Sequence, residues 1–355
     1  VLGYTVEGFK EKDNGVEVLL KDNPSLQADM VVLAIGVTPD TVLAKEAGLE
    51  LGIKESIVVN DRMETSVPDI YAAGDAVQVK HYVTGNDALI SLAGPANKQG
   101  RIIADNICGG DSRYLGSQGS SVIKVFDMTA ATTGINETNA KKSGLDVDTV
   151  ILSPMSHAGY YPGGKVMTMK VVFEKETYRL LGAQIIGYEG VDKRIDVLAT
   201  AIHAGLKATQ LKDLDLAYAP PYSSAKDPVN MAGFMIDNIA KGTLKQWHLE
   251  DMDKISKDKS VVLLDVRTVG EFNRGHMDGF RNIPVDELRE RINEIEKGKP
   301  VYLICQSGLR SYIASRILEG NGYETYNFSG GFRFYDAVVN DRALIEKAYA
   351  CGMDY

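Results

Sequence analysis

The C-terminal hundred residues alternate apolar strands with helices, and this alternation restricts the possible folds more than any other feature. Strands are predicted at 261–266, 301–305 and 325–328, with helices at 285–297 and 311–322 between them. Alternation of this kind is typical of a parallel sheet covered by helices. The sequence therefore predicts a small α/β domain at this end, preceded by a polar helical or linker connection at 241–260.

One cysteine lies where the second of these strands ends. Cys305 is followed by a short loop, 306–310, and then by the predicted helix. Successive backbone N–H groups in such a loop and the N-terminus of the helix both stabilise a thiolate, which predicts that Cys305 is a nucleophile. Arg310 supplies a cation for an anionic sulfur donor or a persulfide. The alternative interpretation is a structural cysteine buried at a strand end.

Four further motifs occur upstream of this loop, at 264–267, 271–272, 275–277 and 282–284. With them, residues 250–355 resemble the rhodanese (sulfurtransferase) family. The resemblance implies sulfur transfer through a persulfide on Cys305. It also implies that Asp265 and Arg267 tie the first strand to the loop, and that His276 holds the loop. The four residues between Cys305 and Arg310 give a smaller loop than in the related phosphatases, which suits a sulfur atom.

Two apolar stretches near the N-terminus each end at a glycine. Residues 28–35, apolar without a break from Met30 to Gly36, predict a strand buried on both faces. Residues 70–73 predict a strand that ends at Gly74 and Asp75, where an aspartate can accept a hydrogen bond from a ligand hydroxyl. Further strands are predicted at 16–20 and 57–59. A helix is predicted at 92–108, and its N-terminus suits an anionic group.

These residues resemble the second half of a flavoprotein of the pyridine nucleotide-disulfide oxidoreductase family. The alternative is a generic buried strand with a capping aspartate. The chain has no Gly-x-Gly-x-x-Gly, and the family's dinucleotide loops and redox cysteine lie toward the N-terminus, so we expect an N-terminally truncated chain. The resemblance implies FAD-binding residues at Gly36, Gly74, Asp75, Pro95, Ala96 and Gln99, the last three near the isoalloxazine ring.

Residues 116–242 resemble the dimerisation domain of coenzyme A-disulfide reductases. The shared motifs lie at 124–127, 133–134, 160–163, 189–194 and 218–223. The resemblance implies a homodimer in which Tyr160 and Tyr218 reach the partner's redox cysteine and assist proton transfer, with Tyr161 and Tyr222 as neighbours. A phenol is a suitable weak acid or oxyanion donor. Aromatic packing at an interface is an equally good interpretation.

The apolar and polar patterns of this middle region predict strands at 122–126, 166–173 and 180–187. They predict helices at 137–143, 192–204 and 229–241. The expected fold class is a multidomain mixture of α/β and α+β. We expect the end of an NAD(P)-binding domain at 1–36, the second segment of an FAD-binding domain at 37–115, a dimerisation domain at 116–242, a linker at 243–259 and a rhodanese-like domain at 260–355.

Composition limits the partners. A net charge of −9 argues against a broad nucleic-acid or membrane surface. An apolar stretch such as 30–37 is eight residues long, whereas a membrane span needs about 20. The three cysteines are too few for a disulfide framework or a thiolate metal site and fit a reducing, cytoplasmic compartment. Cys108 and Cys351 are expected to be inert, although Cys351 is a candidate resolving thiol.

The interpretation that joins these features is an FAD-dependent, NAD(P)H-using reductase of coenzyme A disulfide, coenzyme A persulfide or polysulfide. In it, the rhodanese-like domain carries sulfane sulfur on Cys305. One alternative is an NADH oxidase of the same flavoprotein family. Another is a sulfurtransferase without redox activity, in which the other domains are a dimerising scaffold. The choice between NADH and NADPH and the physiological sulfur substrate stay open.

Overall fold

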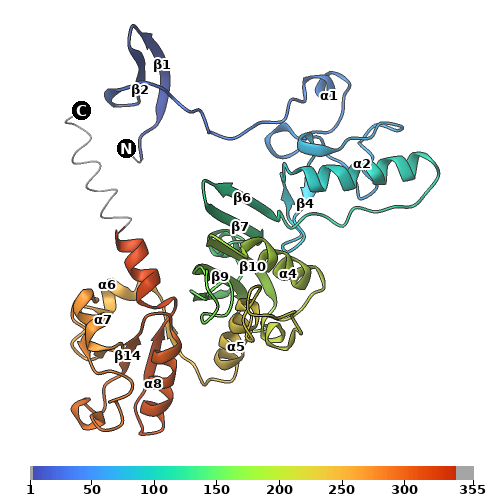
Figure 1. The fold of residues 1–355 in the computed structure, drawn as a ribbon. Coiled ribbons are helices and arrows are strands. Elements are labelled where there is room, and N and C mark those ends of the chain that lie inside the picture. The colour runs from blue at the N-terminus through green and yellow to red at the C-terminus, as the bar shows by residue number, and fades with distance from the viewer. Residues whose placement is uncertain (1–2, 341–355) are drawn as a thin grey trace.

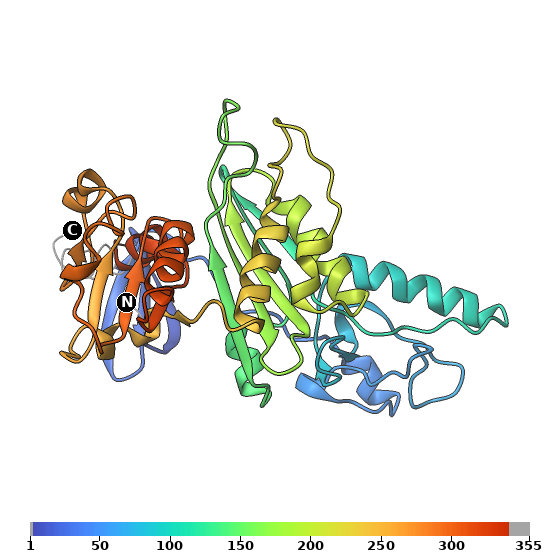
Figure 2. The same ribbon diagram turned by 90° about the horizontal axis from the view of Figure 1, so that it is seen from below.

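The structure, a computed structural model, describes residues 3–340 of the chain. Figure 1 shows an N-terminal region, a central α+β domain and a C-terminal α/β domain in sequence order. Seen from below, the C-terminal domain, the central domain and the region of α2 (Ala93–Ile107) follow one another in a row (Figure 2). Within residues 3–340 no helix is long and apolar enough to cross a bilayer. The predicted multidomain fold class is confirmed.

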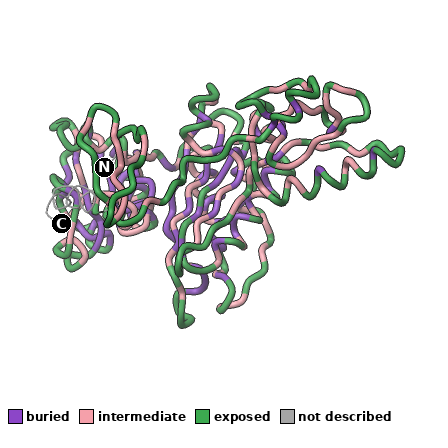
Figure 3. The backbone as a smooth tube through the Cα atoms, turned by 90° about the horizontal axis from the view of Figure 1, so that it is seen from above, coloured by how far each residue is buried: buried purple, intermediate pink, exposed green. Residues whose placement is uncertain are grey.

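Residues 6–28 form a three-stranded antiparallel sheet. Its strands are β1 (Val6–Lys12), β2 (Gly15–Leu20) and β3 (Asn23–Ala28), joined in this order. The sheet contains the strand predicted at 16–20. Its residues are exposed or only partly buried, in contrast to the two following domains, where the buried residues gather (Figure 3).

The segment after this sheet differs from the prediction. The apolar run at 28–35 predicts a strand buried on both faces, and this prediction is wrong. Residues 29–41 have neither helix nor strand, and Val32, Leu33 and Ile35 are 75%, 65% and 85% exposed. A buried strand needs a hydrogen-bonded neighbour on each edge, and residues 29–41 pair with no strand among the described residues. The apolar pattern is therefore present without the sheet that would bury it.

Residues 42–119 form a small unit around α2, which confirms the helix predicted at 92–108. The strands predicted at 57–59 and 70–73 are wrong, because these segments contribute only isolated bridges, two at Ile57 and one at Tyr71. The buried core here consists of Met63, Val77 and Val79, which is too small a layer to support a sheet. The other elements are α1 (Val42–Glu46), η1 (Ile53–Glu55), η2 (Gly74–Ala76), β4 (Val79–Lys80) and β5 (Asp87–Ala88).

The central domain is built on a five-stranded antiparallel sheet with the order β6-β7-β10-β9-β8. Helices α4 (Val191–His203) and α5 (Pro228–Ala240) cover one face of it (Figure 2). Along α4, Ile195, Leu198 and Ile202 are buried at a spacing of three and four residues, as an amphipathic helix requires. The remaining elements are β6 (Ser121–Val125), β7 (Met128–Gly134), α3 (Glu137–Lys142), β8 (Val147–Leu152), β9 (Met167–Glu174), β10 (Leu180–Gly187) and η3 (Ala208–Asp213).

The strands and helices predicted for this domain are all present, to within one or two residues at each end. Strands β7 and β8 are not predicted. Strand β7 is rich in threonine and alanine on both faces, and Thr129, Ala131 and Thr133 share one of them. Its two faces therefore differ little in polarity. Strand β8 is buried over most of its length and lacks the alternation that marks a half-buried strand.

The C-terminal domain has a five-stranded parallel sheet with the order β11-β15-β14-β12-β13. In β14 (Val301–Ile304), Val301 and Leu303 face one buried cluster while Ile304 faces the other, so both faces of the sheet are covered. This confirms the predicted parallel α/β unit. The other elements are β11 (Gln246–Trp247), η4 (Leu249–Asp251), α6 (Met252–Ile255), β12 (Val262–Asp265), α7 (Val269–Arg274), β13 (Arg281–Asn282), η5 (Ile292–Glu294), α8 (Leu309–Glu319) and β15 (Thr325–Phe328).

The helix predicted at 285–297 is wrong. This segment contains turns and only one short helix, η5. Its carbonyl groups are taken by side chains from elsewhere: the Tyr323 hydroxyl donates to the carbonyls of Ile292 and Ile295. The Arg281 guanidinium donates to the carbonyl of Glu294. These tertiary hydrogen bonds replace those that a continuous helix would make along its axis.

The C-terminal domain lies against strand β8, the outermost strand of the central sheet. The backbone N–H of Ile151 donates to Ser329 Oγ at 3.0 Å, and Gln246 Nε2 donates to the carbonyl of Thr149 at 2.7 Å. His248 Nε2 lies 3.2 Å from an oxygen of Asp148. Side chains of the C-terminal domain thus take up backbone groups that an edge strand leaves unpaired.

Candidate functional site

The first candidate site surrounds Cys305, which is fully buried where β14 ends. Its Sγ accepts hydrogen bonds from the backbone N–H of Gly308 at 3.1 Å and from Ser311 Oγ at 3.2 Å. Gly308 precedes α8 and has a φ of +98°, a conformation that favours glycine. Two donors aimed at one sulfur atom favour a thiolate, whereas full burial at a strand end fits the structural alternative, so the nucleophile stays a prediction.

The Ser311 hydroxyl has two acceptors within hydrogen-bonding distance, Cys305 Sγ and the carbonyl oxygen of Gly308. Its Oγ lies 3.1 Å from the carbonyl oxygen of Gly308 as well as near Sγ, and one hydroxyl proton cannot serve both equally. Asn327 Nδ2 also donates to that carbonyl, at 3.1 Å. Because Asn327 keeps the carbonyl satisfied, the Ser311 proton is free to turn to a sulfur anion.

The Arg310 side chain is paired with a carboxylate, which the sequence analysis does not predict. Its guanidinium makes two hydrogen bonds of 2.7 Å to the two carboxylate oxygens of Glu271. This pairing lowers the pKa of Glu271 to about 2 and raises the pKa of Arg310. Glu271 also accepts hydrogen bonds from the backbone and hydroxyl of Thr268, the N-cap of α7. Arg310 is therefore held in one orientation, and its charge is shared with Glu271 before any ligand arrives.

A buried ion pair lies behind this loop. Arg267 Nη2 donates to Asp265 Oδ2 at 2.6 Å and to the carbonyl of Gly275 at 2.7 Å. The guanidinium also lies 3.8 Å from the centre of the Phe332 ring. His276 is stacked on Phe272 and lies 3.1 Å from its carbonyl through Nδ1. These contacts join the end of β12 to the loop before β13. Toward the cysteine loop, Arg267 Nη1 lies 3.4 Å from Oε1 of Gln306.

The second candidate site lies where η2 meets α2. Gln99 is 1% exposed, and its Oε1 accepts a hydrogen bond of 2.7 Å from the backbone N–H of Gly74. A Cβ on Gly74 would lie 3.8 Å from the Cβ of Ala96. The structure therefore brings Gly74 to Ala96 and Gln99 on α2, although 25 positions separate Gly74 from Gln99.

The other predicted flavin residues are placed differently. Pro95 lies in the first turn of α2, whose N-cap Leu92 makes no side-chain cap, so backbone N–H groups of this turn have no capping side chain. Asp75 is exposed beside Gly74. Gly36 lies in the exposed segment 29–41, and the described residues give it no hydrogen bond to this group. An exposed glycine-aspartate turn beside an uncapped fifteen-residue helix fits an anionic, hydroxyl-bearing cofactor such as FAD.

The third candidate site is a tyrosine pair in the central domain. The hydroxyl oxygens of Tyr160 and Tyr218 lie 2.6 Å apart, although 58 positions separate the residues in the sequence. The two side chains are 76% and 45% exposed. The hydrogen bond with Tyr160 raises the pKa of Tyr218. Of the neighbours, Tyr161 packs edge-on against His157, and Tyr222 is exposed.

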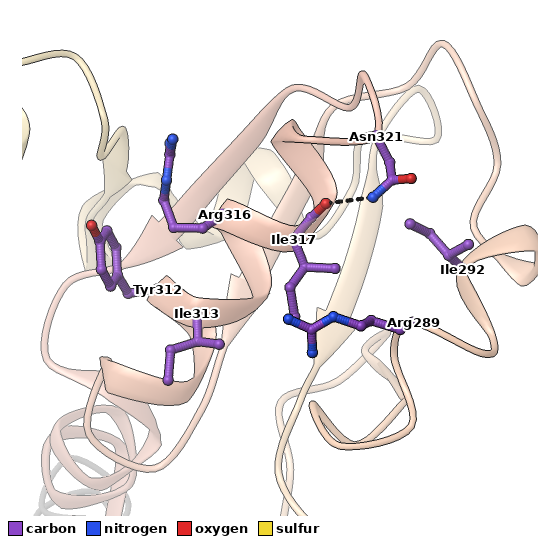
Figure 4. A pocket seen from close by; sticks show the side chains of 7 residues that line it. All are labelled: Arg289, Ile292, Tyr312, Ile313, Arg316, Ile317 and Asn321. Carbon is purple, nitrogen blue, oxygen red and sulfur yellow. Dashed lines mark hydrogen bonds between the residues drawn. The ribbon is translucent and has the colours of Figure 1, made fainter.

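A separate cavity of about 510 Å³ lies on the outer side of α8 (Figure 4). Cys305 does not line this cavity. Ser311, Ala314 and Leu318 form the side of α8 that faces the buried cluster around the cysteine, and the cavity lies on another side of the helix. Among residues 3–340, no group of three or more histidine, cysteine, aspartate or glutamate side chains is arranged to hold a metal ion. Cys108 is exposed, and Cys351 lies outside the described residues. The cavity is lined by Arg289, Ile292, Tyr312, Ile313, Arg316, Ile317 and Asn321.

Sequence reasoning does not give a role to Glu271, Ser311 or Asn327. Glu271 lies in one of the upstream motifs, and its position three residues after Thr268 is the spacing of a capping box, so a partial signal exists. Ser311 follows Arg310 directly and is placed by the turn of α8. Asn327 lies on β15 and reaches the loop only through the fold, so nothing local in the sequence marks it.

Three family models match the chain in order. The pyridine nucleotide-disulphide oxidoreductase model matches residues 1–100, and the dimerisation domain of the same family matches residues 120–228. The rhodanese-like domain model matches residues 248–337. Together the first two models cover more than half of the chain, and the third coincides with the C-terminal parallel sheet.

Solved structures with all three parts are similar to this chain. Reduced Bacillus anthracis CoADR-RHD is 46% identical with a TM-score of 0.90, and the match covers 96% of this chain and 60% of that chain. An NAD-dependent persulfide reductase from A. fulgidus is 40% identical with a TM-score of 0.86, over 94% of this chain and 60% of that one.

A curated relative is the NAD(P)H sulfur oxidoreductase (CoA-dependent) of Pyrococcus furiosus. It is 39% identical over 214 residues, which are 60% of this chain and 48% of that protein. The chain therefore spans about half the length of the curated relatives it matches and 60% of the two solved structures.

Proposed function

Because the chain belongs to the pyridine nucleotide-disulphide oxidoreductase family and carries a rhodanese-like domain, we propose that a protein containing it is an FAD-dependent, NAD(P)H-using reductase. The proposed substrates are coenzyme A disulfide, coenzyme A persulfide and polysulfide. The agreement over 94–96% of this chain with two structures, named CoADR-RHD and persulfide reductase, carries this proposal. The name of the Pyrococcus relative, NAD(P)H sulfur oxidoreductase (CoA-dependent), describes that protein as acting on sulfur in dependence on coenzyme A.

The geometry around Cys305 supports a sulfur-transfer step in the C-terminal domain. The Cys305 thiolate attacks the outer sulfur of a donor, R–S–S⁻, forming a cysteine persulfide and releasing the thiolate RS⁻. No net oxidation occurs, because the bond between the two donor sulfurs breaks as the new sulfur–sulfur bond forms. The N–H of Gly308 and the hydroxyl of Ser311 stabilise the attacking anion. Arg310 lies in the first turn of α8, where its guanidinium, paired with Glu271, can contact an anionic donor.

We propose that Gly74, Asp75, Pro95, Ala96 and Gln99 hold part of FAD. When bound, this cofactor supplies electron transfer between NAD(P)H and a sulfur substrate. Gln99 fixes the backbone of Gly74, and the exposed Asp75 accepts a hydrogen bond from a ligand hydroxyl. The uncapped first turn of α2 offers N–H groups to an anionic part of the cofactor.

We propose further that the protein is a homodimer, as the dimerisation-domain match suggests. In that dimer, Tyr160 and Tyr218 supply or hold a proton for a departing thiolate. Their exposure leaves both phenols accessible to a second subunit or a substrate. The hydrogen bond between the two hydroxyls keeps the pair together.

Two measurements test the function. A protein that contains this chain and its flavin should oxidise NAD(P)H only when coenzyme A disulfide, a persulfide or polysulfide is present. NAD(P)H oxidation with uptake of oxygen, without any sulfane sulfur, would contradict this and favour the NADH oxidase alternative.

The 355-residue chain itself should transfer sulfane sulfur from a donor to an acceptor thiol, and Cys305→Ala should abolish the transfer. Cys108→Ala is the matched control, because that cysteine is exposed and lies outside the sites described. Undiminished transfer by Cys305→Ala would remove the sulfurtransferase part of the proposal. If the whole protein transfers sulfane sulfur but has no flavin-dependent activity, the result would favour the alternative of a sulfurtransferase whose other domains are a dimerising scaffold.

A further inference from the structure

The tyrosine pair is carried by two separate loops. Tyr160 lies between β8 and β9, and Tyr218 lies between η3 and α5. Both side chains are substantially exposed, so neither is fixed by burial. A 2.6 Å hydrogen bond between two exposed side chains on different loops requires the loop backbones to be held at a fixed separation.

A buried arginine holds the first of these loops. Arg194, on α4, is 1% exposed. Its Nη2 donates to the carbonyl of Ser156 at 2.9 Å, and its Nη1 donates to the carbonyl of Gly190 at 3.2 Å. Ser156 lies four residues before Tyr160, so this contact anchors the first tyrosine loop at its base.

The same arginine holds the second loop through a carboxylate. Arg194 Nη2 lies 2.9 Å from Asp227 Oδ2, and Asp227 is 3% exposed. Ser223 Oγ donates to the same carboxylate oxygen at 2.7 Å. The other oxygen, Oδ1, accepts the backbone N–H of Val229 and caps α5. Asp227 therefore fixes the end of the second tyrosine loop to the helix that follows it.

Ser223 then joins the two loops directly. Its carbonyl accepts the backbone N–H of Ala158 at 2.8 Å. Ala158 lies two residues before Tyr160, and Ser223 lies five residues after Tyr218. The hydrogen bonds of Arg194, Asp227 and Ser223 thus bind both loops a few residues from each phenol.

We propose that Arg194 and Asp227 are positioning residues that hold the Tyr160 and Tyr218 hydroxyls within hydrogen-bonding distance of each other. The role of the phenols themselves rests on the function proposed above, whereas the positioning concerns only this chain. A buried ion pair often adds little net stability over apolar residues of the same size, so a role in fixing geometry accounts for its presence better than stability does. The raised pKa of Tyr218 is a consequence that reports the contact with Tyr160.

The test is a pH titration of Tyr218 in the full chain, in which the ¹³C NMR signals of tyrosines labelled at Cζ are monitored. The chain has 17 tyrosines, so Tyr218 is identified as the signal that Tyr218→Phe removes. In the parent protein Tyr218 should titrate above the ordinary value of about 10. Tyr160→Phe should abolish this rise, which sets the full effect of losing the partner.

The informative variants are Arg194→Lys and Asp227→Asn. Lysine keeps the charge, but its single nitrogen cannot reach the separate acceptors that the three nitrogens of the Arg194 guanidinium bind. Asparagine keeps the Oδ1 cap of α5 and removes the carboxylate oxygen that Arg194 binds. Both should move the titration of Tyr218 toward that of Tyr160→Phe. Asp265→Asn, which breaks a similar buried ion pair in the other domain, should leave it unchanged.

A parent-like titration of Tyr218 in folded Arg194→Lys or folded Asp227→Asn would overturn the proposal. If one of these two variants does not fold, the other decides the question. The readout needs neither flavin nor a sulfur substrate, so failure of the reductase function and failure of the positioning proposal give different results. In an active reductase, the two variants should also lower kcat more than they change KM, because substrate contacts are retained.

Discussion

Ser311→Ala should slow the chemistry of Cys305 without unfolding the domain. The Ser311 hydroxyl is one of two donors to Sγ, and the substitution leaves the other donor, the backbone N–H of Gly308, in place. The carbonyl of Gly308 keeps a partner in Asn327. No buried acceptor therefore loses its only hydrogen bond, and the effect should fall on the sulfur anion.

The magnitude follows from the number of donors. A hydrogen bond to a charged group contributes about 1.5 to 3 kcal/mol. Since about 1.4 kcal/mol corresponds to a factor of ten in rate, the loss of the Ser311 donor should lower the rate of sulfur transfer about 10- to 100-fold. The distance between Oγ and Sγ is 3.2 Å, an ordinary length for a hydrogen bond to sulfur. Because sulfur is a weaker acceptor than oxygen, we expect an effect in the lower part of this range.

The assay is the rate at which Cys305 takes sulfane sulfur from a donor, together with its alkylation rate by a small electrophile. Site-resolved mass spectrometry separates Cys305 from the exposed Cys108. Ser315→Ala is the matched control, because Ser315 is buried one turn later on α8 and its hydroxyl donates to the carbonyl of Tyr312. Equal rates for Ser311→Ala and Ser315→Ala at equal melting temperature would refute the reasoning.

Three further outcomes are expected. Glu271→Gln should cost about 1 kcal/mol of unfolding free energy at neutral pH, because its partly exposed ion pair with Arg310 is lost. The pKa of Glu271 is about 2 in the folded state, so this stabilisation is complete above the ordinary glutamate pKa and is lost as the pH falls toward 2, where denaturant melts of the two proteins should converge. Asp265→Asn should cost about 3 to 5 kcal/mol in a denaturant melt, since it leaves a buried arginine without its counter-charge; a cost below 1 kcal/mol would contradict this. Gln99→Ala should weaken FAD binding about tenfold in a fluorescence titration, because the N–H of Gly74 loses its buried acceptor; unchanged affinity would exclude that position from the flavin site.

Sequence patterns predict the C-terminal domain better than the N-terminal region, for a physical reason. Each strand of the parallel sheet is bounded by neighbours that the described chain supplies, so the apolar run at 301–304 becomes a buried strand. The equally apolar run at 28–35 has no such neighbours among the described residues and lies exposed. An apolar pattern shows that a segment is suited to burial. Whether it becomes a buried strand depends on neighbouring strands with which it can pair.

The same distinction applies to the sites. Cys305 and its glycine-containing loop are local features, so the nucleophile could be predicted from a few consecutive residues. The Tyr160 and Tyr218 pair was found only by resemblance, and its 2.6 Å contact depends on loops that meet through tertiary structure. The pairing of Arg310 with Glu271 spans 39 positions and could not be read from spacing. Residues far apart in sequence become a site only where the fold brings their backbones together.

One short segment links the sulfur site to the rest of the molecule. Residues 329–333 brace the cysteine loop, since the N–H of Phe332 donates to the carbonyl of Cys305 at 2.8 Å. At its other end, Ser329 Oγ accepts the N–H of Ile151 on the edge strand β8. Arg333 contacts both sides: its backbone N–H donates to the carbonyl of Gln306, and its side chain reaches the carbonyl that follows β8 at residue 153, at 3.5 Å.

The strand that receives this segment continues into the loop of Tyr160. Residues 329–333 therefore contribute both to the geometry of the sulfur site and, beside Gln246 and His248, to the docking of its domain on the central sheet. A change that loosens this segment should disturb both together, whereas a change at Ser311 should disturb the sulfur site alone. In this structure the C-terminal domain is held to the edge of the central sheet through the backbone that shapes its own reactive loop.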